Sequence, residues 1–200
     1  MNKYHLHPSQ ILGFHSCDKK VGLKVLNGKE GLTPSENKWD WLGHGIYFWE
    51  HNPFRALQYA QDVASGSQKA KAKIETPFVI GCIIDLGLCL SLTEPSNFSL
   101  LKGSFNSLKS TFEKDNLAMP KNIDNSRILD CAVFMQLHKL LELRNWPPYD
   151  TIRGAFPEGK PIYNGCAISN QTHIQICVRN PKAILGYFLP LPIKQVNPNL

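Results

Sequence analysis

The segment WDWLGHGIYFWEHNP, Trp39 to Pro53, crowds large aromatic rings around a tight Gly-His-Gly turn. GIYFWE predicts a strand. Asn52-Pro53 predicts the start of a helix, because Asn is a good cap and Pro suits the first turn. A core strand would be richer in Val, Ile and Leu, whereas a flat ligand needs aromatic faces beside a backbone without Cβ atoms. The segment therefore predicts a strand and a helix that border a site for a flat ligand.

The sequence on either side predicts a mixture of strands and helices. Helices are expected where apolar residues recur at helical spacing behind a capping residue, and short apolar runs predict strands. The expected strands cover 11–16, 45–50, 78–86, 172–178 and 183–190, and the expected helices follow Asp18 and Asn52 and cover 126–145. Two hundred residues without an internal repeat fit a single α+β domain, residues 1–200.

Residues 93–125 break this pattern. The stretch is rich in Ser, Asn, Lys and Pro, and its apolar periodicity is weak. Such a composition is typical of an insertion, or of a helical lid with loose ends. We therefore expect a variable basic insertion here.

Composition and charge narrow the class of protein. A hydrophobic content of 42% with 19% charged residues is that of a globular chain, which excludes wholesale disorder. The formal net charge of +6 favours an acidic partner such as nucleic acid or a phosphorylated cofactor. The alternative is a basic surface that serves only solubility.

The N-terminus has no apolar leader segment, and no apolar run reaches membrane-spanning length. These features predict a cytoplasmic protein with no membrane partner. The six cysteines contain no C-x-x-C pair, so we expect reduced core residues. His5 and His7 lack nearby Cys or carboxylate ligands, and no metal is expected.

Three residues carry the chemical interpretation only when they are taken together. His15 ends an early strand, Tyr47 begins another, and Tyr59 follows on the next helix. Alone, such a His is more often a structural hydrogen-bonding residue, and such a Tyr is more often a core residue.

In this order the residues resemble the diphtheria-toxin-like ADP-ribosyltransferases, the branch that includes poly(ADP-ribose) polymerase catalytic domains. That branch carries an H-G-[ST] motif, a G-x-G-I-Y-F-A motif and a second aromatic residue one helix later. Here they are HSC, GHGIYF and Tyr59 in RALQYA. The resemblance is strong over residues 13–60 and fainter over 172–188. It implies the ADP-ribosyltransferase fold, with mixed and antiparallel sheets split around an NAD cleft that is flanked by helices.

The resemblance also implies roles for individual residues. Tyr47 and Tyr59 would hold the nicotinamide ring of NAD between them, and the backbone of Ser16 would bind its carboxamide. His15 would hydrogen-bond a hydroxyl of the adenosine ribose, and Gly45 would allow the backbone to turn tightly beside the ligand. Ser16 stands where the family usually has Gly, so its side chain would narrow the approach to the site.

The third catalytic element differs from the family pattern. Many members begin a late strand with a Glu that stabilises the oxocarbenium-like charge. In the late strand THIQICV, Gln175 falls at that position. Glu158, on a Gly/Pro loop just before this strand, is the candidate carboxylate, and its alternative is a solvated turn residue. Both remain candidates.

The activity that the resemblance implies is mono-ADP-ribosyl transfer from NAD with release of nicotinamide. Because Ser16 and Gln175 both depart from the family pattern, a non-catalytic module that binds NAD, ADP-ribose or a nucleic-acid end is the alternative.

The basic residues bear on the acceptor. Lys69 to Lys73 and the lysines of 102–121 form a basic belt, and Trp146 and Tyr149 can stack on a base. These features favour RNA or DNA as the acceptor, with a protein side chain as the alternative. Because a free transferase would damage its host, we expect a toxin-like effector that is held by an inhibitor in an antitoxin or anti-phage system.

Overall fold

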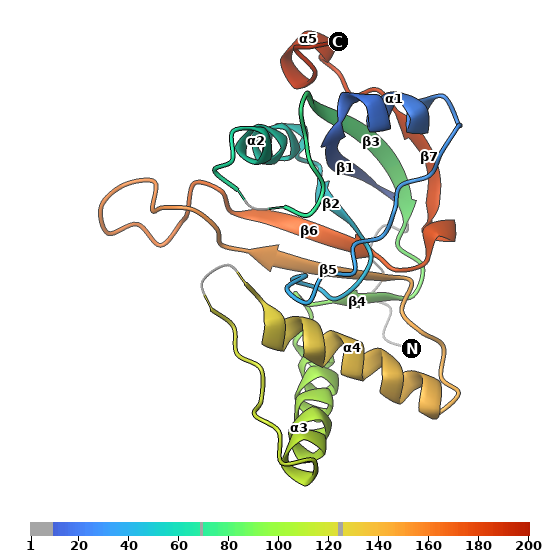
Figure 1. Ribbon diagram of the computed structural model, residues 1–200, viewed down its shortest axis with the longest axis vertical. Helices are drawn as coiled ribbons and strands as arrows, with labels where there is room; N and C mark the ends of the chain where they lie inside the picture. Colours follow the sequence, from blue (N-terminus) through green and yellow to red (C-terminus); the bar gives the residue numbers. More distant parts are fainter. Residues whose placement is uncertain (1–9, 69, 124–125) are drawn as a thin grey trace.

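The computed structural model describes residues 10–68, 70–123 and 126–200 (Figure 1). Within them, hydrogen bonds join seven strands in the order β4-β5-β6-β2-β1-β3-β7. The strands are β1 Gln10–Asp18, β2 Ile46–Glu50, β3 Pro77–Asp85, β4 Cys89–Ser91, β5 Thr151–Phe156, β6 His173–Val178 and β7 Ile184–Phe188. The helices are α1 Lys19–Leu26, α2 Pro53–Ala64, α3 Phe98–Lys114, α4 Ile128–Leu143 and α5 Ile193–Val196, with 3₁₀ turns at Pro95–Asn97 and Pro181–Ala183. The α+β class is confirmed.

Both predicted helix starts are confirmed by their caps. The Asp18 carboxylate accepts a hydrogen bond from the Lys20 N–H and opens α1. The Asn52 side chain accepts from the Arg55 N–H, with Pro53 in the first turn of α2. These bonds satisfy backbone donors that the first turn of a helix leaves without partners. The positions of α1 and α2 are therefore set by local sequence.

Each predicted strand is present, but β4 and β5 were missed. β4 is three residues long, and β5 (TIRGAF) contains Arg and Gly, so neither has the apolar run of a core strand. β4 pairs parallel with β5, whereas the other neighbouring pairs of the described sheet are antiparallel. The sheet is therefore mixed.

The expected split into separate sheets is replaced by a narrow junction within one sheet. β1 and β2 pair at only two positions, Gly13 with Glu50 and Phe14 with Trp49, whereas β1 pairs with β3 along its whole length. The junction is tightly packed, since a Cβ atom on Gly13 would lie 2.6 Å from Ile84 Cδ1 and 2.9 Å from Phe48 Cβ. Beyond Phe14 the two strands diverge.

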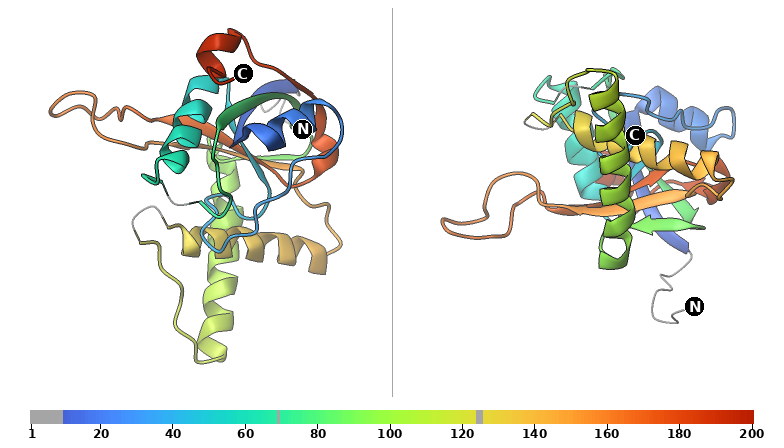
Figure 2. Two further views of the ribbon diagram at one scale, coloured as in Figure 1. Left: turned by 45° about the horizontal axis from the view of Figure 1, so that its top comes forward. Right: turned by 90° about the horizontal axis from the view of Figure 1, so that it is seen from below.

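Residues 93–125 contain one long helix, α3, which confirms the helical alternative for most of the stretch. α3 packs mainly against α4 and projects away from β2 and α2 (Figures 1 and 2). The stretch therefore contains a helix that lies beside α4 and away from β2 and α2.

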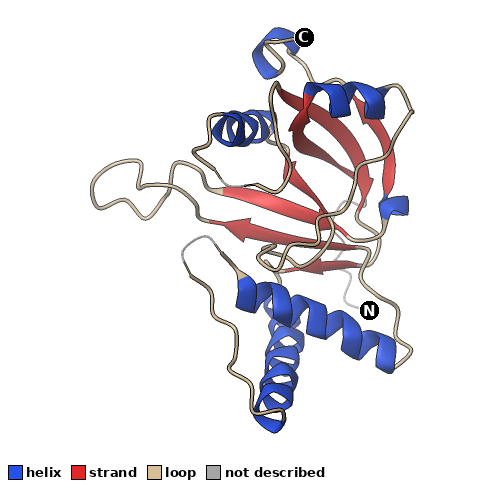
Figure 3. Cartoon of the chain, viewed as in Figure 1, coloured by secondary structure: helices blue, strands red, loops and turns tan. Residues whose placement is uncertain are grey.

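Helices lie beside the sheet (Figure 3), and the buried apolar residues form separate clusters against it. One cluster is built around Phe48 and Ile176, and another joins α4 to the sheet through Phe134, Leu137 and Ile152. The six cysteines are unbridged, four of them buried and two partly buried, in agreement with a reduced protein.

His138 on α4 gives a prediction for stability against pH. It is buried, and burial lowers its pKa to about 4, with the nearby Arg179 charge acting in the same direction. Because the folded-state pKa lies below the unfolded-state value, the unfolded chain binds more protons between the two. The stabilisation is complete above about pH 6.5 and is lost as the pH falls toward 4. Urea unfolding should show a smaller loss of stability over this window in His138→Leu than in wild type. An equal loss would contradict the assignment.

Candidate functional site

The divergence of β1 and β2 leaves an open backbone edge at Ser16. Val79, which lies opposite Ser16 in β3, uses its N–H and C=O to bond the side-chain amide of Asn197, at 2.8 and 3.0 Å. Ser16 and Val79 therefore form a non-hydrogen-bonded antiparallel pair, in which the backbone groups of both residues point outward. On the same edge of β1, the Leu12 carbonyl accepts a bond from the His51 N–H. The N–H and C=O of Ser16 thus face the gap toward β2.

The side chain of Ser16 turns to the neighbouring helix. Its hydroxyl donates to the backbone carbonyl of Ala56 in α2. The bond fixes the side chain against α2. The hydroxyl oxygen, which a Gly at this position would lack, is therefore bound by the protein. One donor and one acceptor of the Ser16 backbone still face the gap, which is the pattern that a carboxamide requires.

His15 bridges the gap between the diverging strands. Its Nδ1 lies 2.8 Å from the carbonyl oxygen of Tyr47. Because a carbonyl only accepts, Nδ1 carries the proton and Nε2 keeps a lone pair. Burial lowers the pKa of His15, so the ring is neutral at pH 7. Nε2 is therefore suited to accept a hydrogen bond from a hydroxyl.

Tyr47 is held by the Gly-His-Gly turn. Its hydroxyl donates to the Gly43 carbonyl at 2.6 Å and accepts from the Leu42 N–H at 2.8 Å. Burial raises the pKa of Tyr47 well above its usual range. Gly45 is needed because a Cβ atom there would lie 2.5 Å from Cys177 Sγ. The two residues thus fix the turn against β6, a role that the sequence alone did not indicate.

Tyr59 on α2 contacts the ring of Trp49, with the ring centroids 5.1 Å apart. Trp49 is two residues after Tyr47 on β2, so both side chains lie on one face of the sheet, where Trp49 packs with α2 and Tyr47 packs with the cluster that includes α4. Tyr59 is half-buried, and one part of it remains open to solvent. Trp49 therefore joins the aromatic set that the sequence assigned to Tyr47 and Tyr59.

Glu158 is not a solvated turn residue. One of its carboxylate oxygens lies 2.7 Å from Nη2 of Arg55, and the two side chains are 18% and 7% exposed. The same oxygen lies 3.8 Å from Nδ1 of His173, and the Arg55 guanidinium is 5.8 Å from the ring of Trp49. Glu158 is thus brought beside α2 and the ends of β2 and β6.

This cluster contains polar atoms that have no hydrogen-bond partner within the described residues. They are Nε1 of Trp49, Nε and Nη1 of Arg55, and Nε2 of His173. His173 donates from Nδ1 to the Gln171 carbonyl, and its pKa is lowered, chiefly by burial, so Nε2 is a neutral acceptor. An unsatisfied buried donor or acceptor costs about 1–3 kcal/mol. The cluster therefore places three donors and one acceptor without partners side by side.

Gln175 lies on the same face of the sheet. In β6 it is directly opposite Trp49 of β2 and Gly154 of β5. Directly opposite residues of an antiparallel pair share a face, and His173 is two residues earlier on the same strand. The structure therefore brings both candidates for the third position, Gln175 and Glu158, to one region.

Arg55 and His173 were missed by the sequence reasoning. An Arg in the first turn of a helix usually faces solvent, and no local pattern signals that this one is buried. Arg153, five residues before Glu158, is nearer to it in the sequence. Arg153 pairs with Glu50, with Nη2 2.8 Å from Oε1, and does not reach Glu158.

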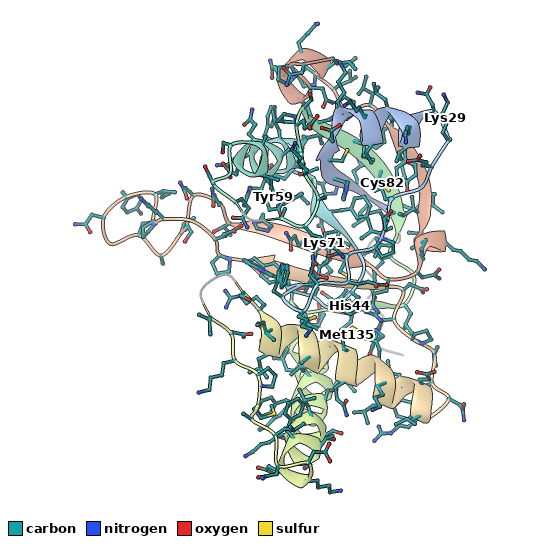
Figure 4. All side chains as sticks on the ribbon, viewed as in Figure 1. Lys29, His44, Tyr59, Lys71, Cys82 and Met135 are labelled. Atoms are coloured by element: carbon teal, nitrogen blue, oxygen red, sulfur yellow. The ribbon has the colours of Figure 1, made fainter. Side chains whose placement is uncertain are left out.

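The basic and aromatic residues expected to bind nucleic acid fall in three separate places, of which one is α3 and the segment after it, where the lysines of 102–121 lie. Lys71 (labelled in Figure 4) and Lys73 lie on the loop after α2. Lys69 lies outside the described residues. Trp146 lies just beyond the end of α4, where the Arg144 guanidinium is 5.3 Å from its ring, and the ring of Tyr149 contacts that of His138. The stretch from Trp146 to Tyr149 therefore borders α4 and is separate from the cluster around Glu158.

The described residues contain no group of three or more His, Cys, Asp or Glu side chains that can hold a metal ion. His5 and His7 lie outside the described residues. None of the described helices has the length and hydropathy needed to cross a bilayer.

The comparisons with known proteins leave the family open. No family model matches the chain, and no solved structure matches it. The chain is similar to the uncharacterized protein MJ0359 of Methanocaldococcus jannaschii, with 25% identity over 191 residues that cover 86% of this chain and 83% of the relative. The similarity extends over most of both proteins and carries no functional information.

Proposed function

We propose that the protein is an NAD-dependent mono-ADP-ribosyltransferase of the α+β class. The observation that carries the proposal is the gap between β1 and β2, into which the Ser16 backbone directs one donor and one acceptor. His15 lies at this gap with a free lone pair at Nε2. Together with the motif resemblance over residues 13–60, this geometry supports binding of nicotinamide by Ser16 and of a ribose hydroxyl by His15.

The aromatic residues complete the nicotinamide site. Nicotinamide is flat and leaves as a neutral ring, so it is stabilised by aromatic faces beside it. Tyr59 is half-buried against Trp49, while the Tyr47 ring is fixed by its hydroxyl. We assign ring contact to Tyr59 and Tyr47, with Trp49 supporting Tyr59.

Glu158 is the carboxylate that we assign to the reacting ribose. As the glycosidic bond breaks, its electrons leave with nicotinamide and positive charge develops on the ribose. A carboxylate that is already oriented stabilises this charge without reorganisation. Arg55 fixes Glu158 through one carboxylate oxygen and leaves the other for substrate. Gln175 orients the ribose through hydrogen bonds.

The acceptor that we propose is a nucleic-acid base. Its amino nitrogen attacks the anomeric carbon that nicotinamide has left, and its proton passes to solvent or to a nearby base. A protein acceptor is the second candidate, because the loop that follows Glu158 exposes apolar side chains, with Ile162, Tyr163 and Ile168 between 53% and 67% exposed. We also propose that the protein is a toxin-like effector and that a separate inhibitor holds it inactive.

The test of the function is incubation with NAD labelled in the adenosine half, together with a cell lysate. Release of nicotinamide with label in macromolecules supports a transferase, and loss of that label after RNase, DNase or protease treatment identifies the acceptor. If purified protein neither releases nicotinamide nor transfers label, the enzymatic proposal fails. Binding of NAD without cleavage would then favour the non-catalytic module.

His15→Ala gives a prediction for NAD binding. Loss of one hydrogen bond to a ribose hydroxyl should weaken binding by about tenfold, as for a bond worth about 1–1.5 kcal/mol. The matched control is Lys19→Ala, because the Lys19 side chain donates to the distant Asn199 carbonyl and its backbone N–H bonds the Thr76 carbonyl, so neither group faces the gap. Calorimetry with NAD should separate the two variants. If they bind NAD alike, His15 only bridges the strands.

A further inference from the structure

A cavity of about 990 Å³ lies beside the C-terminal end of α2 and is bordered by neither β1 nor β2. The lining residues fall into three groups. Val63 and Ala64 end α2, residues of the following 65–74 loop form one wall, and Trp39 and Ser126 form the other. Its volume falls at the upper end of the range for small-molecule sites.

This cavity is distinct from the proposed NAD site. Its lining includes none of the residues assigned above to NAD or to the reacting ribose. It nevertheless adjoins that site along α2, because Tyr59 and Val63 are four residues apart and lie on the same side of the helix. Four residues of helix span about 6 Å. An extended ligand bound in the cavity can therefore reach the region of Tyr59.

The chemistry of the lining matches a nucleotide. Trp39 is 46% exposed and offers an open aromatic face. Lys71 and Lys73 line the wall, the described lining residues include no carboxylate, and Glu75 beside the wall pairs with Lys73 and leaves Lys71 as the cation available to a ligand. Ser65 and Gln68 add hydrogen-bonding groups beside the apolar Val63 and Ile74. An aromatic face combined with cations and apolar contacts is typical of sites for single-stranded nucleic acid.

We propose that this cavity binds a single-stranded nucleic-acid segment, with a base stacked on Trp39 and the phosphates near Lys71 and Lys73. The proposal rests on the proposed function insofar as the bound strand is the acceptor. Base stacking is thus assigned to Trp39. The sequence had pointed to Trp146, which borders the groove between α3 and α4. Lys73 already pairs with Glu75 at 2.8 Å, so Lys71 is the better lysine to test.

The test measures binding of a fluorescein-labelled ten-nucleotide single strand, RNA and DNA in turn, without NAD. Trp39→Ala should weaken binding by about 5- to 150-fold, which is the range for loss of one stacking platform. Lys71→Gln should reduce the slope of log affinity against log salt by about one. Trp146→Ala is the matched control, since Trp146 is similarly exposed, and it should bind as wild type does.

Two results would overturn the proposal. One is unchanged binding in Trp39→Ala, and the other is complete displacement of the strand by NAD or ADP-ribose, which would assign the cavity to the donor. Cleavage of NAD by each variant is measured separately. A protein that binds the strand through Trp39 without cleaving NAD would refute the transferase and leave the nucleic-acid site intact.

Discussion

Glu158→Gln is expected to lower the rate of NAD cleavage by about 10²–10³-fold, which is the cost of removing one key electrostatic group from an active site. NAD affinity should change little, because the carboxylate charge matters mainly once the glycosidic bond is breaking. Measurement of nicotinamide release at saturating and limiting NAD separates the two effects. Glu113→Gln on α3 is the matched control, because Glu113 is exposed and its partner is Lys109 of the same helix.

Gln175→Ala distinguishes the two candidates for the third position. Gln175 lies opposite Trp49, so its loss should weaken NAD binding as well as turnover. Full activity of Glu158→Gln together with loss of activity in Gln175→Ala would assign the site to β6 alone. Glu158 would then be a structural partner of Arg55.

Arg55→Met is expected to destabilise the fold and to impair turnover together. Removal of one partner from a buried ion pair costs about 3–5 kcal/mol, because the remaining charge stays buried without compensation. Glu158 is 18% exposed and can reach water in part, so we expect a loss near the lower end of that range. Urea unfolding measures the loss, and nicotinamide release under folding conditions measures the effect on turnover.

The double variant Arg55→Met/Glu158→Gln shows whether the two residues act as a pair. If they do, the double variant should be more stable than the sum of the single changes predicts, because the uncompensated carboxylate has been removed. Arg144→Met, which alters an exposed guanidinium stacked on Trp146, should leave stability and turnover unchanged. Additive effects in the double variant would show that the ion pair contributes to neither stability nor turnover.

Local sequence accounts for much of the fold. Asp18 and Asn52 were predicted as caps and act as caps, because capping depends on residues within one helical turn. Strands with continuous apolar or aromatic runs were also found in the predicted places. β4 and β5 were missed because a short strand and a strand with Arg and Gly owe their pairing to neighbours that are distant in the chain.

The candidate site was likewise predicted in part from the sequence and decided in part by the tertiary structure. His15, Ser16, Tyr47 and Tyr59 stand out in the sequence because their order resembles a known motif. The sequence by itself therefore determined the α+β class, the helix starts and which residues to examine first. Only the tertiary structure decided that β1 and β2 diverge after Phe14 and that Glu158 meets Arg55, 103 residues earlier in the chain. Such contacts depend on packing between elements, and local residue patterns carry no information about which buried charge will find which partner.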